Sequence, residues 1–299
     1  MKCRRCKAPA QVALPSHNTA FCRECFLVFF SRQVAQAVKK HHMFTRKDKI
    51  LAALSGGKDS IALITELSRQ GYDVTGLHVD VGIDGFSAKA RGIVEKFCQD
   101  LGLKLIIVPL AEVGLAIPRV KAAIKRPICS ICGKIKRYYF NKTALDQGYT
   151  VLATGHNLDD EAGRLLANTL RWDTTYLAAQ GPVLPAEAGF APKVKPLYRL
   201  SEFETASYCF LRGLDYHMDP CPYAKGAAFT FRKQLMQSLE QKSPGSKIGF
   251  YEGFLQKAKP VFLALEQKKD LKPRPCPECG YPTSAGICAI CRLKQMLAG

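Results

Sequence analysis

The sequence lacks any long apolar segment. No uninterrupted apolar run approaches the roughly 18 residues that a bilayer-spanning helix requires. The first residues, Met-Lys-Cys-Arg-Arg-Cys, also lack the apolar core of a secretory signal peptide. These two absences argue against an integral membrane protein and against an exported one. We therefore expect a cytoplasmic protein that has no membrane partner.

Acidic residues are scarce relative to basic ones. The chain has 25 Asp and Glu against 44 Lys and Arg, which gives a net charge of +19. The imbalance is strongest between Met1 and Lys47, where ten basic residues accompany a single acid, Glu24. Such an excess of positive charge is typical of proteins that bind a polyanion, most often a nucleic acid. An enzyme of small acidic substrates and a merely solvated basic face are the alternatives.

The chain contains 13 cysteines, which is many for a protein expected in the cytoplasm. Disulfides are rare in that compartment, so metal binding is the better interpretation. Two sets of four cysteines, each made of two Cys-x2-Cys motifs, have the spacing of structural zinc sites: Cys3, Cys6, Cys22 and Cys25, and Cys276, Cys279, Cys288 and Cys291. Free thiols or redox pairs are the alternative. Cys98 and Cys209 lie in apolar helical patterns, which favours a place in the core.

Three further cysteines stand apart from these sets. Cys129 and Cys132 lie in the middle of the chain, and Cys221 follows 89 residues after Cys132. Structural zinc prefers four protein ligands, whereas three cysteines suit a cubane iron–sulfur cluster whose fourth iron stays open. The first two lie in the stretch Arg119–Lys142, with eight basic residues and no acid, so we expect depressed thiol pKa values. The alternative is that Cys221 is buried and inert.

Residues 49 to about 240 alternate between strand-like and helix-like patterns. Apolar strand patterns occur at 50–54, 74–79, 105–110 and 150–154, and helical patterns lie between them at 60–70, 87–101 and 134–147. This alternation predicts an α/β fold with a parallel sheet and helices on both faces. Elsewhere the patterns predict a helix at 31–42, a long loop at 172–196, a capping-box helix start at Ser201-x-x-Glu204, and helices near 226–242 and 246–269 separated by 243–245.

The composition divides the chain into four parts. We expect an N-terminal zinc-binding module at 1–28, a basic linker helix within 29–48, a catalytic domain at 49–272 and a C-terminal zinc-binding module at 273–299. The terminal modules are too small to bury a core of their own, and metal binding then supplies the folding free energy.

The stretch Ser55–Ser60 reads Ser-Gly-Gly-Lys-Asp-Ser and lies between a predicted strand and a predicted helix. Its adjacent glycines allow a close backbone approach to a ligand, and the free N–H groups of the turn attract an anion. Lys58 adds a point charge, and Ser60 is expected to be the helix N-cap. The stretch is not a Walker motif, because four residues are missing between glycine and Gly-Lys. It resembles the pyrophosphate-binding loop of ATP pyrophosphatases, which split ATP into AMP and pyrophosphate; an ordinary turn is the alternative.

Two other segments are expected at the same crevice, because ligands of parallel sheets bind at the carboxyl ends of the strands. Gly155-His156 follows a strand and leads into a run of three acids at 159–161. These acids suit Mg²⁺ coordination or proton transfer beside a triphosphate, and helix capping is the alternative. Lys136 lies one helical turn after Cys132, so it can point into the pocket that contains this cysteine.

Taken together, these motifs resemble those of the tRNA 2-thiouridine synthetases of the TtuA type, which are PP-loop ATP pyrophosphatases with a HUP-like fold. The resemblance extends over nearly the whole chain. The matching segments are the N-terminal four-cysteine set, the loop at 55–60, Gly-Leu-His at 76–78, Cys-x-x-Cys-Gly-x-x-Lys-Arg-Tyr at 129–138, Thr-Gly-His-Asn-Leu-Asp-Asp-Glu at 154–161, part of 204–213, 221–227, and the C-terminal four-cysteine set. The wobble-uridine thiolases of archaea and eukaryotes are more distantly similar.

The resemblance implies roles for individual residues. It implies catalytic roles for Asp59, Lys136 and Asp160, and a 4Fe-4S cluster on Cys129, Cys132 and Cys221. It also implies ATP contacts by Ala53, Ser55, Gly56, Gly57, Lys58, Asp59, Ser60, Val79, Lys136 and Gly155. ATP, Mg²⁺, the 4Fe-4S cluster and two Zn²⁺ are the implied cofactors.

The same resemblance implies a reaction and its partners. ATP adenylates the C2 oxygen of a tRNA uridine, and sulfide on the open iron then displaces AMP, which leaves 2-thiouridine, or 5-methyl-2-thiouridine in the T-loop. The sulfur donor is a ubiquitin-like thiocarboxylate carrier or free sulfide, and the expected assembly is a homodimer. The expected tRNA contact is the basic arm of Arg32, Lys39, Lys40, Arg46 and Lys47, and the stretch Arg119–Lys142 is the alternative.

Three other functions stay open. A PP-loop enzyme that thiolates a wobble uridine or a cytidine would share the same motifs. A PP-loop ligase of the tRNA-lysidine or argininosuccinate type would need neither the three central cysteines nor the zinc modules. A non-catalytic RNA-binding protein with zinc modules would not need the glycine loop or Asp160.

Overall fold

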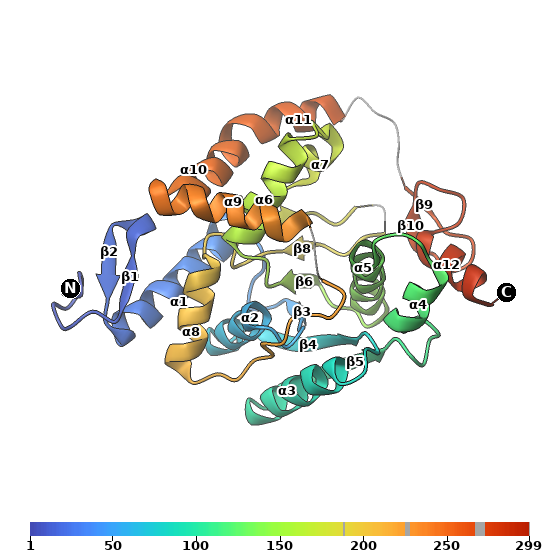
Figure 1. Cartoon of the computed structure of the whole chain (residues 1–299), viewed down its shortest axis with the longest axis horizontal. Coiled ribbons are helices and arrows are strands. Elements are labelled where there is room, and N and C mark those ends of the chain that lie inside the picture. The colour runs from blue at the N-terminus through green and yellow to red at the C-terminus, as the bar shows by residue number, and fades with distance from the viewer. Residues whose placement is uncertain (188, 225–227, 267–272, 299) are drawn as a thin grey trace.

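The computed structural model describes residues 1–187, 189–224, 228–266 and 273–298. Its centre is a six-stranded sheet with the order β5-β4-β3-β6-β8-β7 (Figure 1). The strands are β3 (Lys49–Ala53), β4 (Asp73–Asp80), β5 (Leu105–Pro109), β6 (Val151–Thr154), β7 (Val183–Leu184) and β8 (Lys193–Val194). Neighbouring strands pair in parallel except β7, which is antiparallel to β8. The four predicted strands and their parallel pairing are confirmed.

The helices connect and cover these strands. They are α1 (Arg23–Lys40), α2 (Lys58–Arg69), α3 (Phe86–Asp100), α4 (Ile117–Ala123), α5 (Ile128–Asp146), α6 (Leu158–Thr169), α7 (Thr174–Ala179), α8 (Glu202–Arg212), α9 (Ala228–Lys242), α10 (Ser246–Gly253), α11 (Lys259–Glu266) and α12 (Ala289–Ala298). A short 3-10 turn, η1 (Pro15–His17), and a π-helical turn, η2 (Phe254–Ala258), complete the helical segments. Two hairpins lie in the terminal regions: β1 (Val12–Leu14) with β2 (Thr19–Phe21), and β9 (Arg274–Pro275) with β10 (Pro282–Thr283).

Both faces of the sheet are covered, as the residues of β3 show: alternate side chains of this strand pack in two different cores. Ile50 and Ala52 pack in one core with the apolar residues of α1, α2 and α8. Leu51 points to the opposite face, where it packs with Ala144 of α5. A strand that is buried on both faces carries apolar residues at successive positions, which is why the run at 50–54 was recognisable in the sequence.

Helix α1 attaches the N-terminal region to this fold. It begins at Arg23, earlier than the predicted start at residue 31, and crosses the boundary that was expected between residues 28 and 29. Its apolar face, with Phe26 and Phe30, is fully buried in the core that includes α2 and α8. Phe30 stacks on Tyr208 of α8 with a centroid distance of 4.0 Å. The N-terminal region is thereby packed on the sheet's own helices.

The prediction of a long loop at 172–196 is wrong, because this stretch contains α7, β7 and β8. β8 pairs with β6, with Lys193 opposite Leu152, and β7 closes the edge of the sheet. Strands of two residues show no alternation, so the sequence pattern did not reveal them. The helices predicted near 226–242 and 246–269 appear as α9 and as α10, η2 and α11, while 226–227 and 267–269 lie outside the described residues. Gly245, with a φ of +94°, separates α9 from α10.

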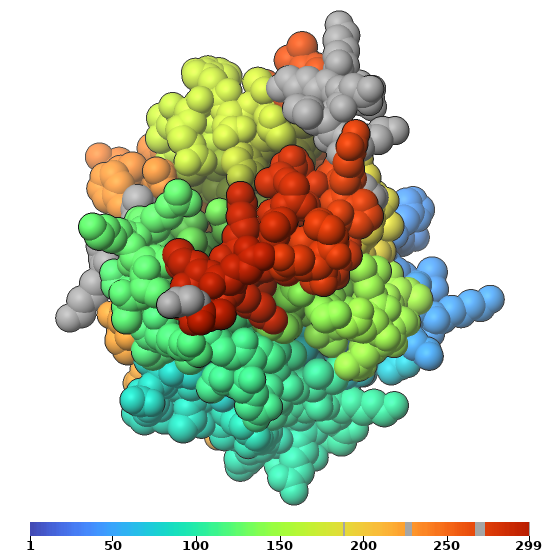
Figure 2. All heavy atoms as spheres, turned by 90° about the vertical axis from the view of Figure 1, so that its right-hand side faces the viewer, coloured from blue at the N-terminus to red at the C-terminus, as the bar shows by residue number. Residues whose placement is uncertain are grey.

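The C-terminal region lies across one face of the molecule, shown in red in Figure 2. Helix α12 packs against α5, and its buried residues share a core with those of α4 and α5. The guanidinium of Arg119 in α4 donates a hydrogen bond to the carbonyl of Leu297, at 2.8 Å. In the part of the chain that the structure describes, no helix is both long and apolar enough to cross a bilayer.

Candidate active site

A cavity of about 300 Å³ opens at the carboxyl ends of β3, β4 and β6. It is lined by Ala53, Leu54, Ser55, Asp59, Ser60, Val79, Lys136, Phe140, Thr154, Gly155, His156 and Asp160. The structure thus brings together all three residues expected to be catalytic, Asp59, Lys136 and Asp160. Gly56, Gly57 and Lys58 belong to the same loop but are not among the lining residues.

The loop between β3 and α2 is braced by its own serines. Ser60 is not the N-cap that was predicted, because α2 begins at Lys58 and Gly57 occupies the cap position. The hydroxyl of Ser60 instead donates to the carbonyl of Gly57 at 2.9 Å and accepts from the backbone N–H of Ser55 at 3.2 Å. Gly56 has a φ of +86°, which a residue with a side chain rarely adopts. These hydrogen bonds and the backbone conformation of Gly56 therefore fix the shape of the turn that leads into α2.

Gly155 lets the end of β6 touch the start of α2. A Cβ atom at this position would lie 2.9 Å from the carbonyl carbon and oxygen of Asp59 and 3.0 Å from the backbone nitrogen of Ser60. These atoms are backbone and cannot rotate away. The two loops that face each other across the cavity are thus in direct contact.

Asp59 is held by three neighbouring groups. One carboxylate oxygen accepts hydrogen bonds from the side-chain amide of Asn157 at 3.0 Å and from the hydroxyl of Thr205 at 2.5 Å. The other oxygen lies 3.1 Å from the ammonium of Lys58. Three donors from α2, α8 and the turn before α6 therefore fix this carboxylate at the cavity wall.

The three acids at 159–161 have different environments. Asp159 pairs with Lys247 of α10, and Glu161 pairs with Lys195 at 2.8 Å; both acids are buried. Asp160 alone of the three lines the cavity, and it also forms a capping box with Asn157. The alternative of helix capping thus applies to Asp160, while Asp159 and Glu161 bind neighbouring elements together.

Asp160 belongs to a chain of ion pairs that borders the cavity. Its carboxylate lies 3.1 Å from the ammonium of Lys233 in α9, and Lys233 lies 3.0 Å from Glu202 in α8. Glu202 in turn pairs with Lys58 at 2.8 Å. Burial raises the pKa of Asp160, and the charge of Lys233 opposes that rise. Neither Glu202 nor Lys233 was predicted, because ion pairs between distant segments leave no local pattern in a sequence.

The cysteines expected to hold a cluster lie in one neighbourhood. Cys129 and Cys132 occupy the first turns of α5, which begins six residues before the predicted start at 134. The thiol of Cys129 donates to the carbonyl of Tyr223 at 3.5 Å, two residues after Cys221. Cys132 and Cys221 both pack against the same core. The expectation of a depressed pKa is wrong for Cys132, because burial raises it, against the opposing charge of Lys136.

The spacing of these three thiols differs from that of a single-ion site. Among the described residues, groups of three or more ligand atoms within 4.8 Å of one another occur at two places, and neither includes Cys129, Cys132 or Cys221. A cluster binds each cysteine through a different iron, so its ligands are farther apart than those of one ion. The three thiols therefore do not form the close group of ligands that a single zinc ion requires.

The two four-cysteine sets do converge. In each set the four sulfur atoms lie within 4.8 Å of one another, as the ligands of one tetrahedral ion must. Backbone N–H groups, that of Cys288 foremost, lower the pKa of Cys276 to about 6, which favours the thiolate that a metal needs. Cys98 and Cys209 are buried in the main core, as predicted.

Comparison with known proteins agrees with this geometry. The model of the PP-loop domain matches residues 27–239, and the model of the N-terminal LIM domain of the 2-thiouridine synthetase TtuA matches residues 2–27. The tRNA-5-methyluridine(54) 2-sulfurtransferase of Thermus thermophilus is 42% identical over 98% of this chain and 91% of its own length. The chain belongs to the family of PP-loop tRNA 2-sulfurtransferases.

Other members of this sulfurtransferase family extend the comparison. The tRNA-5-methyluridine(54) 2-sulfurtransferase of Pyrococcus horikoshii is 41% identical over 98% of this chain and 93% of its own length. Among solved structures, the U34-tRNA thiolase NcsA from Methanococcus maripaludis, with its [4Fe-4S] cluster, has a TM-score of 0.83 at 26% identity. That match covers 99% of this chain and 96% of the thiolase.

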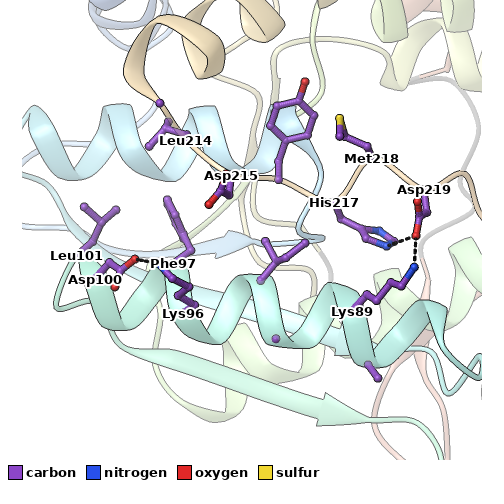
Figure 3. A pocket seen from close by; sticks show the side chains of 15 residues that line it. Lys89, Lys96, Phe97, Asp100, Leu101, Leu214, Asp215, His217, Met218 and Asp219 are labelled. Carbon is purple, nitrogen blue, oxygen red and sulfur yellow. Dashed lines mark hydrogen bonds and ion pairs between the residues drawn. The ribbon is translucent and has the colours of Figure 1, made fainter.

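A second, larger hollow of about 590 Å³ lies between α3 and residues 213–219 of the sulfurtransferase (Figure 3). Within it, the ammonium of Lys89 lies 3.0 Å from Asp219, which His217 also faces (Figure 3). The backbone N–H of His217 donates to the carbonyl of Gly56 at 2.8 Å, so this segment supports the glycine loop from behind. None of the predicted site residues lines it.

Proposed function

We propose that this protein is an ATP-dependent tRNA 2-sulfurtransferase that converts 5-methyluridine 54 of the T-loop to its 2-thio form. The observation that supports this most directly is the position of α5. Its first turns carry Cys129 and Cys132, and one turn later Lys136 lines the cavity beside the glycine loop. One helix therefore joins a cysteine site to a nucleotide site. The choice of position 54 is supported by the names of the relatives at 42% and 41% identity.

In the proposed reaction, ATP binds in the cavity with its phosphates at the backbone N–H groups of the loop at 55–60. The C2 oxygen of the uridine attacks the α-phosphorus, and pyrophosphate leaves. Lys136 and Lys58 offset the charge that develops on the leaving group. Attack through O2 releases the N3 proton, and we assign its acceptance to Asp160, one of two carboxylates that line the cavity. Asp59, fixed by Asn157 and Thr205, holds the start of α2 in place.

Sulfur transfer completes the proposed reaction. Hydrosulfide attacks C2, the C2–O bond breaks, and AMP leaves, so that the product carries C2=S and regains its N3 proton. Cys129, Cys132 and Cys221 would hold a 4Fe-4S cluster, which when bound supplies an open iron that can carry the sulfide. We assign Zn²⁺ to each of the two four-cysteine sets, whose sulfur atoms converge. Mg²⁺ is expected to accompany ATP.

The proposal also includes a division of the chain and its partners. The expected modules at 1–28 and 273–299 would flank the catalytic domain at 49–272, with the helix within 29–48 packed on it. A ubiquitin-like thiocarboxylate carrier or free sulfide as donor, and a homodimer, rest on the resemblance alone. In the basic arm, Lys40 pairs with Glu252 and Arg46 donates to the carbonyl of Gly71, so both have structural contacts.

Replacement of the three central cysteines tests the function. We expect Cys129→Ala, Cys132→Ala and Cys221→Ala each to abolish formation of the 2-thio nucleoside, while ATP affinity is kept. The assay is an anaerobic reaction with tRNA, ATP and sulfide, followed by mass spectrometry of the nucleosides and a visible absorption spectrum. The control is Cys98→Ala, which removes a buried thiol from the core. This variant should still form the 2-thio nucleoside. Full activity in any of the three variants would refute the cluster assignment.

A further inference from the structure

Positive charge gathers between α5, α6 and β8, directly beside the ATP cavity. Arg137 follows the cavity-lining Lys136 on α5, Arg164 lies on α6, and Lys193 lies on β8. Lys193 is opposite Leu152 in the β6–β8 pairing, and Leu152 belongs to the core on the α5 side of the sheet. Lys193 therefore faces α5, toward Arg137. The proposed reaction uses none of these three side chains.

This cluster has no anion to balance it. Burial, followed by the charges of Lys195 and Arg137, lowers the pKa of Lys193 to about 7, and Arg164 contributes in the same direction. The nearby carboxylate, Glu161, is already engaged, because both of its oxygens lie 2.8 Å from the ammonium of Lys195. Within the described ranges, Arg137, Arg164 and Lys193 form no ion pair with a carboxylate. Basic side chains this close together that lack a counter-ion indicate a site for a negatively charged ligand, whose charge would also favour the protonated ammonium of Lys193.

Aromatic rings border the same cluster. The guanidinium of Arg164 lies 5.4 Å from the centre of the Phe229 ring in α9. Tyr176 of α7 and Tyr281 of the C-terminal region are close enough to Arg137 to act on its pKa, and Tyr176 is 61% exposed. A group of cations beside an exposed aromatic ring such as Tyr176 is typical of sites that hold unpaired nucleotides, with phosphates on the cations and a base on the ring.

We propose that Arg137, Arg164 and Lys193, here called the phosphate cradle, bind the RNA phosphates next to the target uridine. Bound there, the RNA backbone passes beside the cavity, because His156 both lines the cavity and lies near the cradle. This inference rests on the proposed function for the identity of the RNA. The phosphates of ATP are the other source of the same chemistry, but the glycine loop already provides for them, and a triphosphate has no need of the bordering rings.

The test is tRNA binding as a function of salt. Each phosphate contact contributes about −0.7 to −0.9 to the slope of log affinity against log salt. In the holoprotein, the triple variant Arg137→Gln, Arg164→Gln, Lys193→Gln should flatten the slope by about two units and weaken binding roughly 100-fold at 0.15 M salt. The double variant Arg164→Gln, Lys193→Gln keeps Arg137, which follows the cavity-lining Lys136, and should show about two thirds of this effect. ATP affinity should not change in either.

The matched control removes two cations elsewhere. Arg69 at the end of α2 and Lys104 before β5 are exposed and lie at the amino-terminal edge of the sheet, opposite the cavity. The control double variant Arg69→Gln, Lys104→Gln should keep the wild-type salt slope. A charge-conserving triple variant, Arg137→Lys, Arg164→Lys, Lys193→Arg, should also show the wild-type slope.

Each contrary outcome has a distinct meaning. A wild-type slope in the triple variant, or loss of ATP affinity instead of tRNA affinity, would overturn the phosphate cradle. A slope that falls only when Lys39, Lys40, Arg46 and Lys47 are neutralised would overturn it in favour of the basic arm. If the wild-type protein binds tRNA through the cradle but yields no thiolated nucleoside, the cradle stands and the proposed function fails.

Discussion

Replacing Gly155 with alanine would show how closely the two sides of the nucleotide cavity must approach. The new Cβ would lie 2.9 Å from backbone atoms of Asp59, whereas ordinary contacts begin at 3.4 Å, so one side must move by 3.4 − 2.9 = 0.5 Å. Overpacking of this kind costs about 1–3 kcal/mol of folding free energy. Because a misplacement of about 1 Å can cost 10²-fold in rate, a shift of half that size should lower AMP formation roughly tenfold.

The measurements are urea unfolding, ATP affinity and the rate of AMP formation with saturating tRNA. Gly249→Ala is the control, because Gly249 lies within α10 and a Cβ there meets nothing within 4 Å. Alanine is the better helix former, so this variant should gain up to about 1 kcal/mol and keep its activity. If Gly155→Ala matched Gly249→Ala in stability and in ATP affinity, the contact between the two loops would have no role in shaping the site.

Two further predictions concern the charged residues of the cavity. Asp59→Ala and Lys136→Ala should stop the formation of AMP and pyrophosphate with the fold intact by circular dichroism; appearance of ADP and phosphate in the wild type would show that the pyrophosphatase assignment is wrong. Lys233→Met removes the charge that opposes the burial-raised pKa of Asp160, so this pKa should rise further. If Asp160 must be ionised for activity, the rate falls as the pH drops through its pKa. The acidic limb of the pH–rate profile should therefore lie at higher pH in Lys233→Met than in the wild type. A limb at the same pH in both proteins would exclude Asp160 as the proton acceptor.

The sequence predicted β3, β4, β5 and β6 and most of the cavity, because these features follow from local patterns, whereas it did not reveal the two-residue strands β7 and β8. The apolar runs at 50–54 and 150–154 mark buried parallel strands, and the loop at 55–60 needs its glycines for a turn with a φ of +86° at Gly56. The early start of α5 was missed because the Cys-Ser-Ile-Cys segment has weak helical propensity. Pro127 directly before the helix was an available signal, since proline favours the start of a helix.

The sequence alone already indicates that the three acids at 159–161 cannot all have the same role. Successive residues of a helix point about 100° apart, so three in a row cannot all face one cavity. The structure accordingly directs Asp160 to the cavity and buries Asp159 and Glu161. Lys233 and Glu202 could not have been predicted in this way, because each lies in a different helix and their pairing depends on where the tertiary fold places α8 and α9.

The rigidity of α5 has a consequence for how chains of this kind can vary in length. Within one helix, Cys132 and Lys136 are separated by about 6 Å along the axis, and inserting one residue between them would rotate Lys136 by about 100°. Such an insertion would turn the lysine out of the nucleotide cavity while leaving the cysteine in place. Insertions and deletions are therefore expected to be tolerated in surface loops but not between Cys129 and Phe140. In that segment the helix fixes the distance and the orientation between the cysteine site and the nucleotide cavity.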